Sequence, residues 1–128
     1  MKDETQLWLD FSKENLKSAY ILLKSELYNP SLQNIQQSIE KALKAVFVEK
    51  ALKFKKTHSI TELNNILLQR NINIELKEDD CEFIDTIYLP SKYPISQVLP
   101  DYEPNEEICQ KGIEIAESVL KSVQDILK

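Results

Sequence analysis

The sequence predicts an all-α protein, an antiparallel up-and-down bundle of four to five helices. Three observations predict it: apolar residues recur at helical spacing in five segments, strand-like alternation is weak, and most connections between the segments are short. Of its 128 residues, 42% are hydrophobic and 29% charged, which is enough apolar material for a folded core. We therefore expect residues 1–128 to form a single helical domain.

A proline separates the first two predicted helices. The first runs from about Glu4 to Tyr28 and ends at Asn29 and Pro30, because Asn caps helices and Pro suits the first helical position. Its apolar residues at helical spacing are Leu7, Phe11, Leu16, Ala19, Leu23 and Leu27. The second helix, about Pro30 to Leu52, has the clearest apolar stripe, formed by Leu32, Ile35, Ile39, Ala42, Leu43 and Val46.

The second helix also carries a stripe on the side away from its apolar face, formed by Gln37, Lys41, Lys44 and Val48. Two interpretations stay open. Lys and Gln are ordinary residues of a solvated helix face. The stripe also suits a surface that faces a partner or a phosphate, since Lys53, Lys55 and Lys56 follow just beyond the helix.

Two shorter helices follow. Ser59 and Glu62 match a capping box, in which Glu62 reaches back to the cap, and this predicts a helix that ends at about Gln69. His58 directly precedes the cap, and the sequence leaves open whether it packs against the helix start or acts as a catalytic base. An acidic first turn, which suits the positive end of a helix dipole, begins the next helix at about Lys77–Tyr88.

The longest irregular segment is predicted from about Leu89 to Glu103, and a loop of this length in a compact chain is often functional. The last helix, about Pro104 to Leu127, places along one side Ile108, Ile115, Ala116, Val119, Val123 and Ile126. Gly112 lies inside this helix, where it costs about 1 kcal/mol relative to Ala but permits close approach of another helix.

Scarce residues exclude several classes of protein. The single Gly removes glycine-rich phosphate loops and the single His removes zinc motifs, so we expect no metal and no cofactor. Cys81 and Cys109 are too few and too far apart for a disulfide framework, and we interpret them as buried free thiols. The N-terminal residues lack an apolar signal core, and no run approaches the roughly 18 apolar residues of a membrane span, which predicts a cytoplasmic protein without membrane contact.

Charge is unevenly distributed along the chain. Residues 1–70 hold ten Lys and one Arg against eight acids, a balance of +3, whereas residues 71–128 hold five Lys against thirteen acids, a balance of −8. Readers of duplex sequence rely on Arg for guanine contacts, and a chain whose only Arg is Arg70 does not fit that class. The Lys-rich first half suits a phosphate-bearing partner.

Several segments resemble, in the same order, the motifs of the HEPN domain family, small helical domains named for nucleotide binding in prokaryotes and higher eukaryotes. They are Trp8 with residues 19–23, residues 36–45, residues 56–60 with Leu63, residues 87–94, and Glu106 and Glu107 with Ala116 and Glu117. Residues 87–94 resemble the Tyr-Ile-Pro-Thr-Arg-Tyr-Pro loop of the prokaryotic branch, with Lys92 in place of Arg.

The resemblance implies a homodimer that partners a minimal nucleotidyltransferase and contacts a nucleotide or RNA, as a non-catalytic binding module. The predicted binding residues are Tyr88, Pro90, Lys92, Tyr93 and Pro94 of the proline-containing loop, with Lys41 and Lys44 as a second surface. A structural alternative stays open, in which the prolines fix the loop and the two tyrosines simply pack under it.

The alternative function is a metal-independent ribonuclease, the toxin of a toxin–antitoxin pair. Family members with this activity place a His shortly after an Arg, but here no His follows Arg70, and His58 lies twelve residues before it. In this alternative His58 is the base, and Lys92 or Arg70 stabilises the charge of the transition state. A third interpretation is a structural dimer or adaptor without a ligand.

Overall fold

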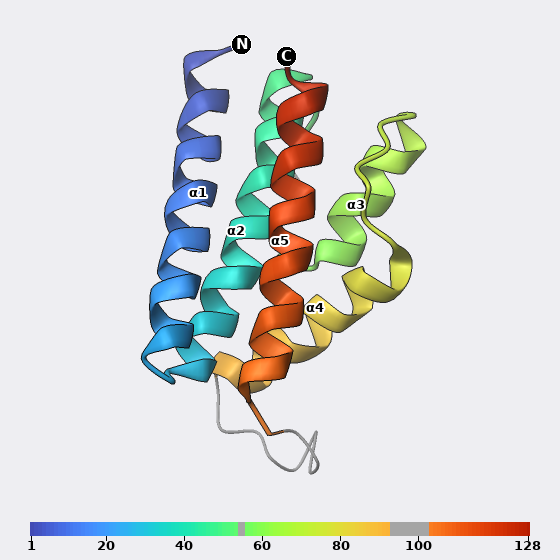
Figure 1. Ribbon diagram of the computed structural model, residues 1–128. Helices are drawn as coiled ribbons and strands as arrows, with labels where there is room; N and C mark the ends of the chain where they lie inside the picture. Colours follow the sequence, from blue (N-terminus) through green and yellow to red (C-terminus); the bar gives the residue numbers. More distant parts are fainter. Residues whose placement is uncertain (54–55, 93–102) are drawn as a thin grey trace.

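The computed structural model describes residues 1–53, 56–92 and 103–128. Every regular element in these ranges is a helix: α1 (Asp3–Lys24), α2 (Tyr28–Glu49), α3 (Ile60–Gln69), α4 (Glu78–Lys92) and α5 (Glu106–Ile126). Helices α1, α2 and α5 run side by side, with α1 opposite in direction to the other two, and α3 and α4 cover the remaining flank of α2 (Figure 1). None of the described helices combines the length and apolar character needed to span a membrane. The predicted all-α bundle is confirmed.

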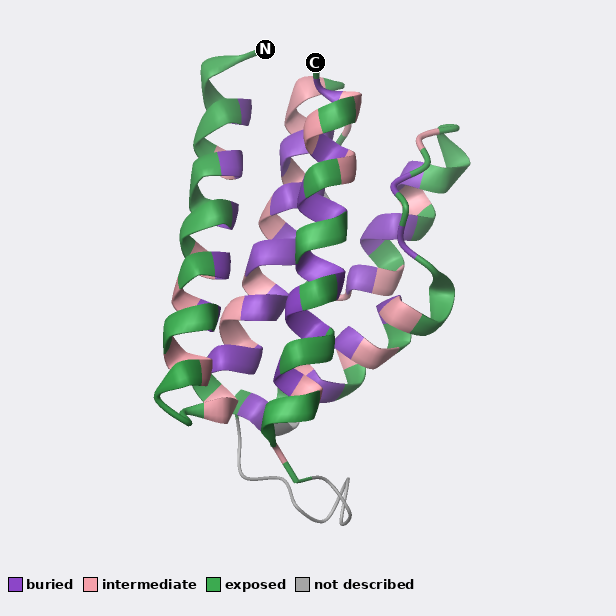
Figure 2. Ribbon diagram, viewed as in Figure 1, coloured by how far each residue is buried: buried purple, intermediate pink, exposed green. Residues whose placement is uncertain are grey.

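Helix α2 lies at the centre of the bundle and packs against all four other helices. Its predicted apolar stripe is confirmed, because each of the six residues is at most 1% exposed. Figure 2 shows that the buried residues of α2 and α5 face the interior, whereas much of α1 is exposed. Complete burial of one Leu, Ile or Val contributes about 1.5–3 kcal/mol, so this stripe is a main source of the stability of the fold.

Helix α1 packs on α2 through a face that only partly matches the predicted one, because Leu16 and Ala19 are buried as predicted whereas Leu27 is exposed. Its buried residues are Thr5, Leu9, Ser12, Leu16 and Ala19. Leu7 and Phe11, which the apolar spacing placed with the core, are 56% and 50% exposed. The hydroxyl of Ser12 donates to the carbonyl of Ser38 (2.7 Å), and the hydroxyl of Ser38 donates to the carbonyl of Ser12 (2.9 Å). These small side chains bond to the facing backbone and form a close seam, which a count of apolar residues alone misses.

The turn between α1 and α2 lies before the predicted position at Asn29 and Pro30. Glu26, with a φ of 59°, takes the left-handed conformation that commonly follows the end of a helix. Helix α2 then begins at Tyr28, and Pro30 becomes its third residue. An amide in the first turn of a helix has no partner within the helix, so the missing N–H of proline costs nothing there.

Helix α4 extends beyond its predicted end at Tyr88, through Pro90 to Lys92. Residues 89–92 of the predicted irregular segment therefore belong to α4, and residues 93–102 of that segment lie outside the described residues. The end of α4 is held against α2, because Nε2 of Gln33 donates to the carbonyl of Ser91 (2.7 Å). Helix packing at this end outweighs the tendency of proline to stop a helix.

Helix α5 packs closely on α2 at its only glycine. Gly112 is buried, and a Cβ atom there would lie 2.9 Å from Cδ1 of Ile35, so the absence of a side chain permits the predicted close approach. The helix begins after Asn105, whose Oδ1 accepts a hydrogen bond from the amide of Ile108 (2.8 Å).

Both cysteines are buried free thiols, as the sequence predicted. Burial, together with the nearby carboxylate of Asp85, raises the pKa of Cys81 to about 11. A thiol with so high a pKa carries little thiolate at neutral pH, which fits the burial of Cys81 in the core.

Candidate functional site

The structure brings two of the predicted site residues, His58 and Tyr88, into one cavity, which we call the His58 cleft, and places Lys92 against Tyr88 beside it. This cavity of about 260 Å³ is lined by His58, Ser59, Asp85, Tyr88 and Leu89. The ring centroids of His58 and Tyr88 are 5.9 Å apart. Nζ of Lys92 lies 3.4 Å from the hydroxyl of Tyr88 and 5.6 Å from the centroid of its ring. The loop before α3 and the end of α4 thus place an imidazole, an aromatic ring and an ammonium group side by side.

Asp85 on α4 builds one wall of the His58 cleft by holding the start of α3. Its carboxylate accepts hydrogen bonds from the amides of Ile60 (2.7 Å) and Thr61 (3.1 Å) and from the hydroxyls of Ser59 (3.0 Å) and Thr61 (2.6 Å). These donors lie at the positive end of the helix, where a carboxylate is most favourable. Half of the predicted capping box is confirmed, since the hydroxyl of Ser59 accepts from the amide of Glu62 (3.2 Å). The amide of Ser59 donates to Oγ1 of Thr57 (3.0 Å) in place of the predicted side chain of Glu62. The sequence analysis assigned no role to Asp85, because its contacts with α3 are tertiary.

A buried glutamate on α2 connects the His58 cleft to one of the predicted lysines. The side chain of Glu40 is 5% exposed, its Oε1 lies 2.9 Å from Nδ1 of His58, and its Oε2 lies 2.8 Å from Nζ of Lys44. Nε2 of Gln36 donates both to Oε1 of Glu40 (3.2 Å) and to the carbonyl of His58 (2.8 Å). Nζ of Lys44 also lies 5.9 Å from the ring centroid of Trp8 on α1. A continuous set of contacts therefore runs from α1 through α2 to the start of α3.

The carboxylate of Glu40 is ionised although it is buried. Burial acts to raise the pKa of Glu40, but hydrogen bonds from Lys44, His58 and Gln36 outweigh it and lower the pKa below its ordinary value. The sequence analysis missed this residue. The available signal was the spacing of Gln36, Glu40 and Lys44, which places the three side chains on one side of a helix, one turn apart.

Lys41 lies in a different environment from Lys44. Its Nζ donates to Oδ1 of Asn15 (2.8 Å) and lies 5.7 Å from the ring centroid of Phe11, so its contacts are with α1. The predicted second surface therefore divides. Lys44 belongs to the network around Glu40, and Lys41 belongs to the exposed surface between α1 and α2.

The predicted site residues that remain are Pro90, Tyr93, Pro94 and Arg70, and none of them is among the described residues that line the His58 cleft. Pro90 lies in the last turn of α4, and Tyr93 and Pro94 lie outside the described residues. Arg70 follows the last residue of α3, whereas His58 precedes the first. A helix rises about 1.5 Å per residue, so the ten residues of α3 hold these two side chains about 15 Å apart along its axis within one chain. His58 and Arg70 are therefore not paired within one chain.

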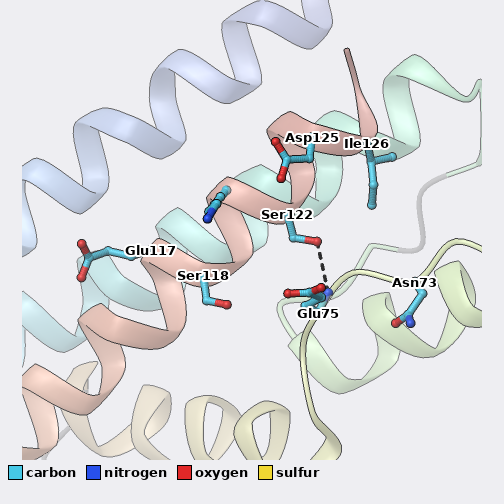
Figure 3. Close-up of a pocket in the computed structure, with 8 residues that line it drawn as sticks. Asn73, Glu75, Glu117, Ser118, Ser122, Asp125 and Ile126 are labelled. Atoms are coloured by element: carbon cyan, nitrogen blue, oxygen red, sulfur yellow. Dashed lines mark hydrogen bonds between the residues drawn. The ribbon is translucent and has the colours of Figure 1, made fainter.

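A larger cavity, which we call the acidic cavity, lies beside α5. It has a volume of about 670 Å³, and its lining includes Asn73, Glu75, Glu117, Lys121, Ser122 and Asp125. Figure 3 shows these side chains and the hydrogen bond from the amide of Glu75 to the hydroxyl of Ser122 (3.2 Å). Three carboxylates and one ammonium group disfavour an anionic ligand. Within the described part of the chain, no three His, Cys, Asp or Glu side chains are grouped so that they could hold a metal ion.

Known proteins are similar to this chain over nearly its whole length. The protein "Putative toxin MJ1304" of Methanocaldococcus jannaschii is 28% identical over 133 residues, which cover 96% of this chain and 88% of that protein. The crystal structure of TT1696 from Thermus thermophilus has a TM-score of 0.78 at 22% identity and covers 97% of this chain and 98% of its own. The structure of ST0689, an archaeal HEPN homologue, has a TM-score of 0.70 at 21% identity and covers 100% of both chains.

A family model confirms the assignment that the motifs suggested. The model of the HEPN domain matches residues 5–126, which include all five helices from the first turn of α1 to the last residue of α5. The chain belongs to the HEPN domain family.

Proposed function

We propose that this protein is a non-catalytic HEPN module that binds a phosphate-bearing ligand, a nucleotide or RNA, in the His58 cleft. The observation that supports this ligand class is the convergence of His58, Tyr88 and Lys92. An ammonium group binds phosphate, an aromatic ring stacks on a base or ribose, and an imidazole adds a directed hydrogen bond. The carboxylate of Asp85 does not oppose an anion strongly, because it already accepts hydrogen bonds from the start of α3.

The volume of the His58 cleft indicates that only part of the ligand enters it. Pockets that enclose a whole small molecule measure about 300–1,000 Å³. The cleft measures about 260 Å³, which suits one phosphate with its adjoining ribose while the rest of the ligand projects outward. An RNA end and a mononucleotide both carry this unit.

In the same proposal the protein acts as a homodimer together with a minimal nucleotidyltransferase. Leu7 and Phe11 lie one turn apart on α1 and are 56% and 50% exposed, and such an apolar pair favours a covering surface. We assign this surface to a second copy of the chain. The relative that is named a toxin supports a further partner, since a toxin needs a protein that holds it inactive, and the family resemblance implies a nucleotidyltransferase.

The assembly is tested by measuring the size of the purified protein, alone and after co-expression with a minimal nucleotidyltransferase from the same genome. We expect a dimer that shifts to a larger stoichiometric complex. Phe11→Asp should give a monomer, because a charge on the apolar pair opposes its burial. Leu68→Asp is the matched control, since Leu68 is 46% exposed on α3, away from the exposed face of α1, and should leave the dimer intact. A monomeric wild type contradicts the homodimer, and a dimer that ignores the enzyme contradicts the partnership.

The ligand is tested by calorimetric titration with adenosine 5′-monophosphate and with inorganic phosphate. We expect saturable binding of the nucleotide, and weaker binding of phosphate, because phosphate alone leaves the ring of Tyr88 and the imidazole of His58 without contacts. Failure of the wild type to bind either compound contradicts the proposed ligand class.

A second candidate function, metal-independent RNA cleavage, is favoured by one observation. Glu40 orients the imidazole of His58, and Lys92 contacts Tyr88, which lines the same cleft as His58, so a base and a cation for the developing charge both lie next to Tyr88. It predicts cleavage of RNA that is insensitive to chelator and lost in His58→Ala. Full activity of His58→Ala contradicts this function. A wild type that does not cleave RNA also contradicts it, and the binding function then remains.

A further inference from the structure

The contact between Glu40 and His58 has a chemical consequence that a simple ion pair would not have. The ion pair of Glu40 and Lys44 alone would not indicate a functional role for Glu40, because apolar residues often replace a buried ion pair without loss of stability. The other carboxylate oxygen, however, lies 2.9 Å from Nδ1 of His58. An ionised carboxylate can only accept hydrogen bonds, so Nδ1 must carry the proton. In a neutral imidazole the second nitrogen, Nε2, is then an acceptor.

We propose that Glu40 is a positioning residue that keeps the proton of neutral His58 on Nδ1, so that Nε2 acts in the His58 cleft as an acceptor for a ligand hydroxyl, such as that of a ribose. The inference rests on the proposed function, since it concerns the ligand of the same cleft. It assigns the hydroxyl to His58 and the phosphate to Lys92.

The orientation of the imidazole is held at two points, although the side chain of His58 is 65% exposed. Glu40 accepts from the ring, and Nε2 of Gln36 donates to the backbone carbonyl of His58 (2.8 Å). The same Gln36 nitrogen also lies 3.2 Å from Oε1 of Glu40, so it joins the backbone of His58 to the carboxylate that orients its ring. This is the arrangement by which a second layer of residues fixes the tautomer of a functional histidine. Among the described residues, no protein group makes a hydrogen bond to Nε2 of His58.

The donors and acceptors of the cleft specify the chemistry of the ligand. Nζ of Lys92 and the hydroxyl of Tyr88 lie together and can donate to phosphate oxygens. Nε2 of neutral His58 can only accept, and the dianion of a phosphate monoester, which has no proton to donate, does not satisfy it. A ligand that carries a hydroxyl beside a phosphate, as a ribonucleotide does, satisfies both groups. The cleft should therefore distinguish a ribonucleotide from an analogue that lacks the ribose hydroxyls.

The tautomer can be measured directly, because the chain contains one histidine. Nitrogen NMR of isotope-labelled wild-type protein at about pH 9, where an ordinary imidazole is neutral, distinguishes a protonated nitrogen from an unprotonated one. We expect protonated Nδ1 and unprotonated Nε2, the reverse of the tautomer that free histidine favours in water. Protonated Nε2 in the wild type overturns the inference, and this result needs no variant.

Glu40→Gln should reverse the tautomer. The ammonium of Lys44 is a charged donor and takes the single amide oxygen of the new side chain, while Nε2 of Gln36 keeps the carbonyl of His58 as its acceptor. The amide nitrogen therefore faces Nδ1 of His58. Nδ1 must then accept, and the proton moves to Nε2. Glu49→Gln is the matched control, because Glu49 lies on the same helix and also accepts two hydrogen bonds, from the amide of Lys2 and the hydroxyl of Thr5. We expect the control to keep the wild-type tautomer. An unchanged tautomer in Glu40→Gln overturns the role of Glu40.

Ligand selection is tested by titration with adenosine 5′-monophosphate and its 2′,3′-dideoxy analogue. We expect the wild type to favour the ribonucleotide about fivefold, the size of one hydrogen bond, and Glu40→Gln to lose this preference while it still binds inorganic phosphate. Equal affinities in the wild type overturn the hydroxyl selection and leave the proposed function standing. Failure to bind either nucleotide or phosphate contradicts the proposed function and with it the ligand part of the inference. The NMR measurement then still decides the role of Glu40.

Discussion

The His58 cleft and the acidic cavity differ in how firmly their walls are held. The smaller His58 cleft is bordered by two carboxylates with multiple partners, Glu40 and Asp85, which hold the imidazole and the start of α3. In the larger acidic cavity, the bond between the amide of Glu75 and the hydroxyl of Ser122 joins the connection between α3 and α4 to α5. Volume alone therefore does not indicate which cavity is a functional site. A binding site needs side chains that are held in place before the ligand arrives, and the His58 cleft has them.

The largest expected difference between the two regions concerns the loss of a carboxylate. Glu40→Ala should lower the free energy of unfolding by about 3 kcal/mol, because it leaves Lys44 and Gln36 without their buried acceptor. Glu117→Ala in the acidic cavity should change stability by less than about 0.5 kcal/mol, since Glu117 is exposed. Urea denaturation of both variants measures the difference. Equal losses would remove the distinction between the two regions.

The same carboxylate predicts how stability depends on pH. The pKa of Glu40 is lowered in the folded protein, as buried hydrogen bonds from Lys44, His58 and Gln36 outweigh the effect of burial. Its contribution is complete above the ordinary carboxyl pKa of about 4.3 and is lost as the pH falls through the lowered value. Wild-type protein should therefore lose stability between about pH 5 and pH 3, and Glu40→Ala should lose less over this interval. Parallel losses in the two proteins would contradict the assignment to Glu40.

A smaller loss of stability is expected when the residue that connects neighbouring segments at each cavity is replaced by Ala. Asp85→Ala should cost about 2 kcal/mol, the upper range for a helix cap, because the amides of Ile60 and Thr61 lose their acceptor. Ser122→Ala should cost about 0.5 kcal/mol, since it removes one partly exposed hydrogen bond from the amide of Glu75. Thermal unfolding ranks the two variants. A larger loss in Ser122→Ala would mean that the acidic cavity is the better held region.

The smallest expected effect is a loss of ligand affinity when one lysine is removed at each cavity. Lys92→Gln should weaken binding of adenosine 5′-monophosphate about tenfold, or about 1.4 kcal/mol, by removing one charged hydrogen bond to phosphate. Lys121→Gln, the matched lysine of the acidic cavity, should leave the affinity unchanged. Calorimetric titration compares the two. Weaker binding in Lys121→Gln alone would move the ligand to the other cavity.

Local sequence patterns determined most of the helical fold. The apolar stripe of α2 and the cap at Ser59 were predicted correctly, because both depend on residues within a few turns of each other. The face of α1 was predicted only in part, since Leu16 and Ala19 are buried but Leu7, Phe11 and Leu27 are exposed. Its buried side includes Ser12, which a hydrophobic pattern excludes from a core, and the burial of Ser12 depends on the carbonyl of Ser38 on another helix. The end of α4 was also misplaced, since contacts with α2 carry that helix past Pro90.

The sequence by itself determined the kinds of chemistry available to this protein: one imidazole, one glycine, a lysine-rich first half, and motifs in the order of the HEPN family. It also singled out His58, Tyr88, Lys92 and Lys44. Only the tertiary structure decided that His58 and Tyr88 share a cleft, that Lys41 belongs elsewhere, and that Glu40 holds the imidazole. The physical reason is that periodicity reports the face of one helix at a time, whereas a buried charge finds its partners across helices, wherever packing excludes water.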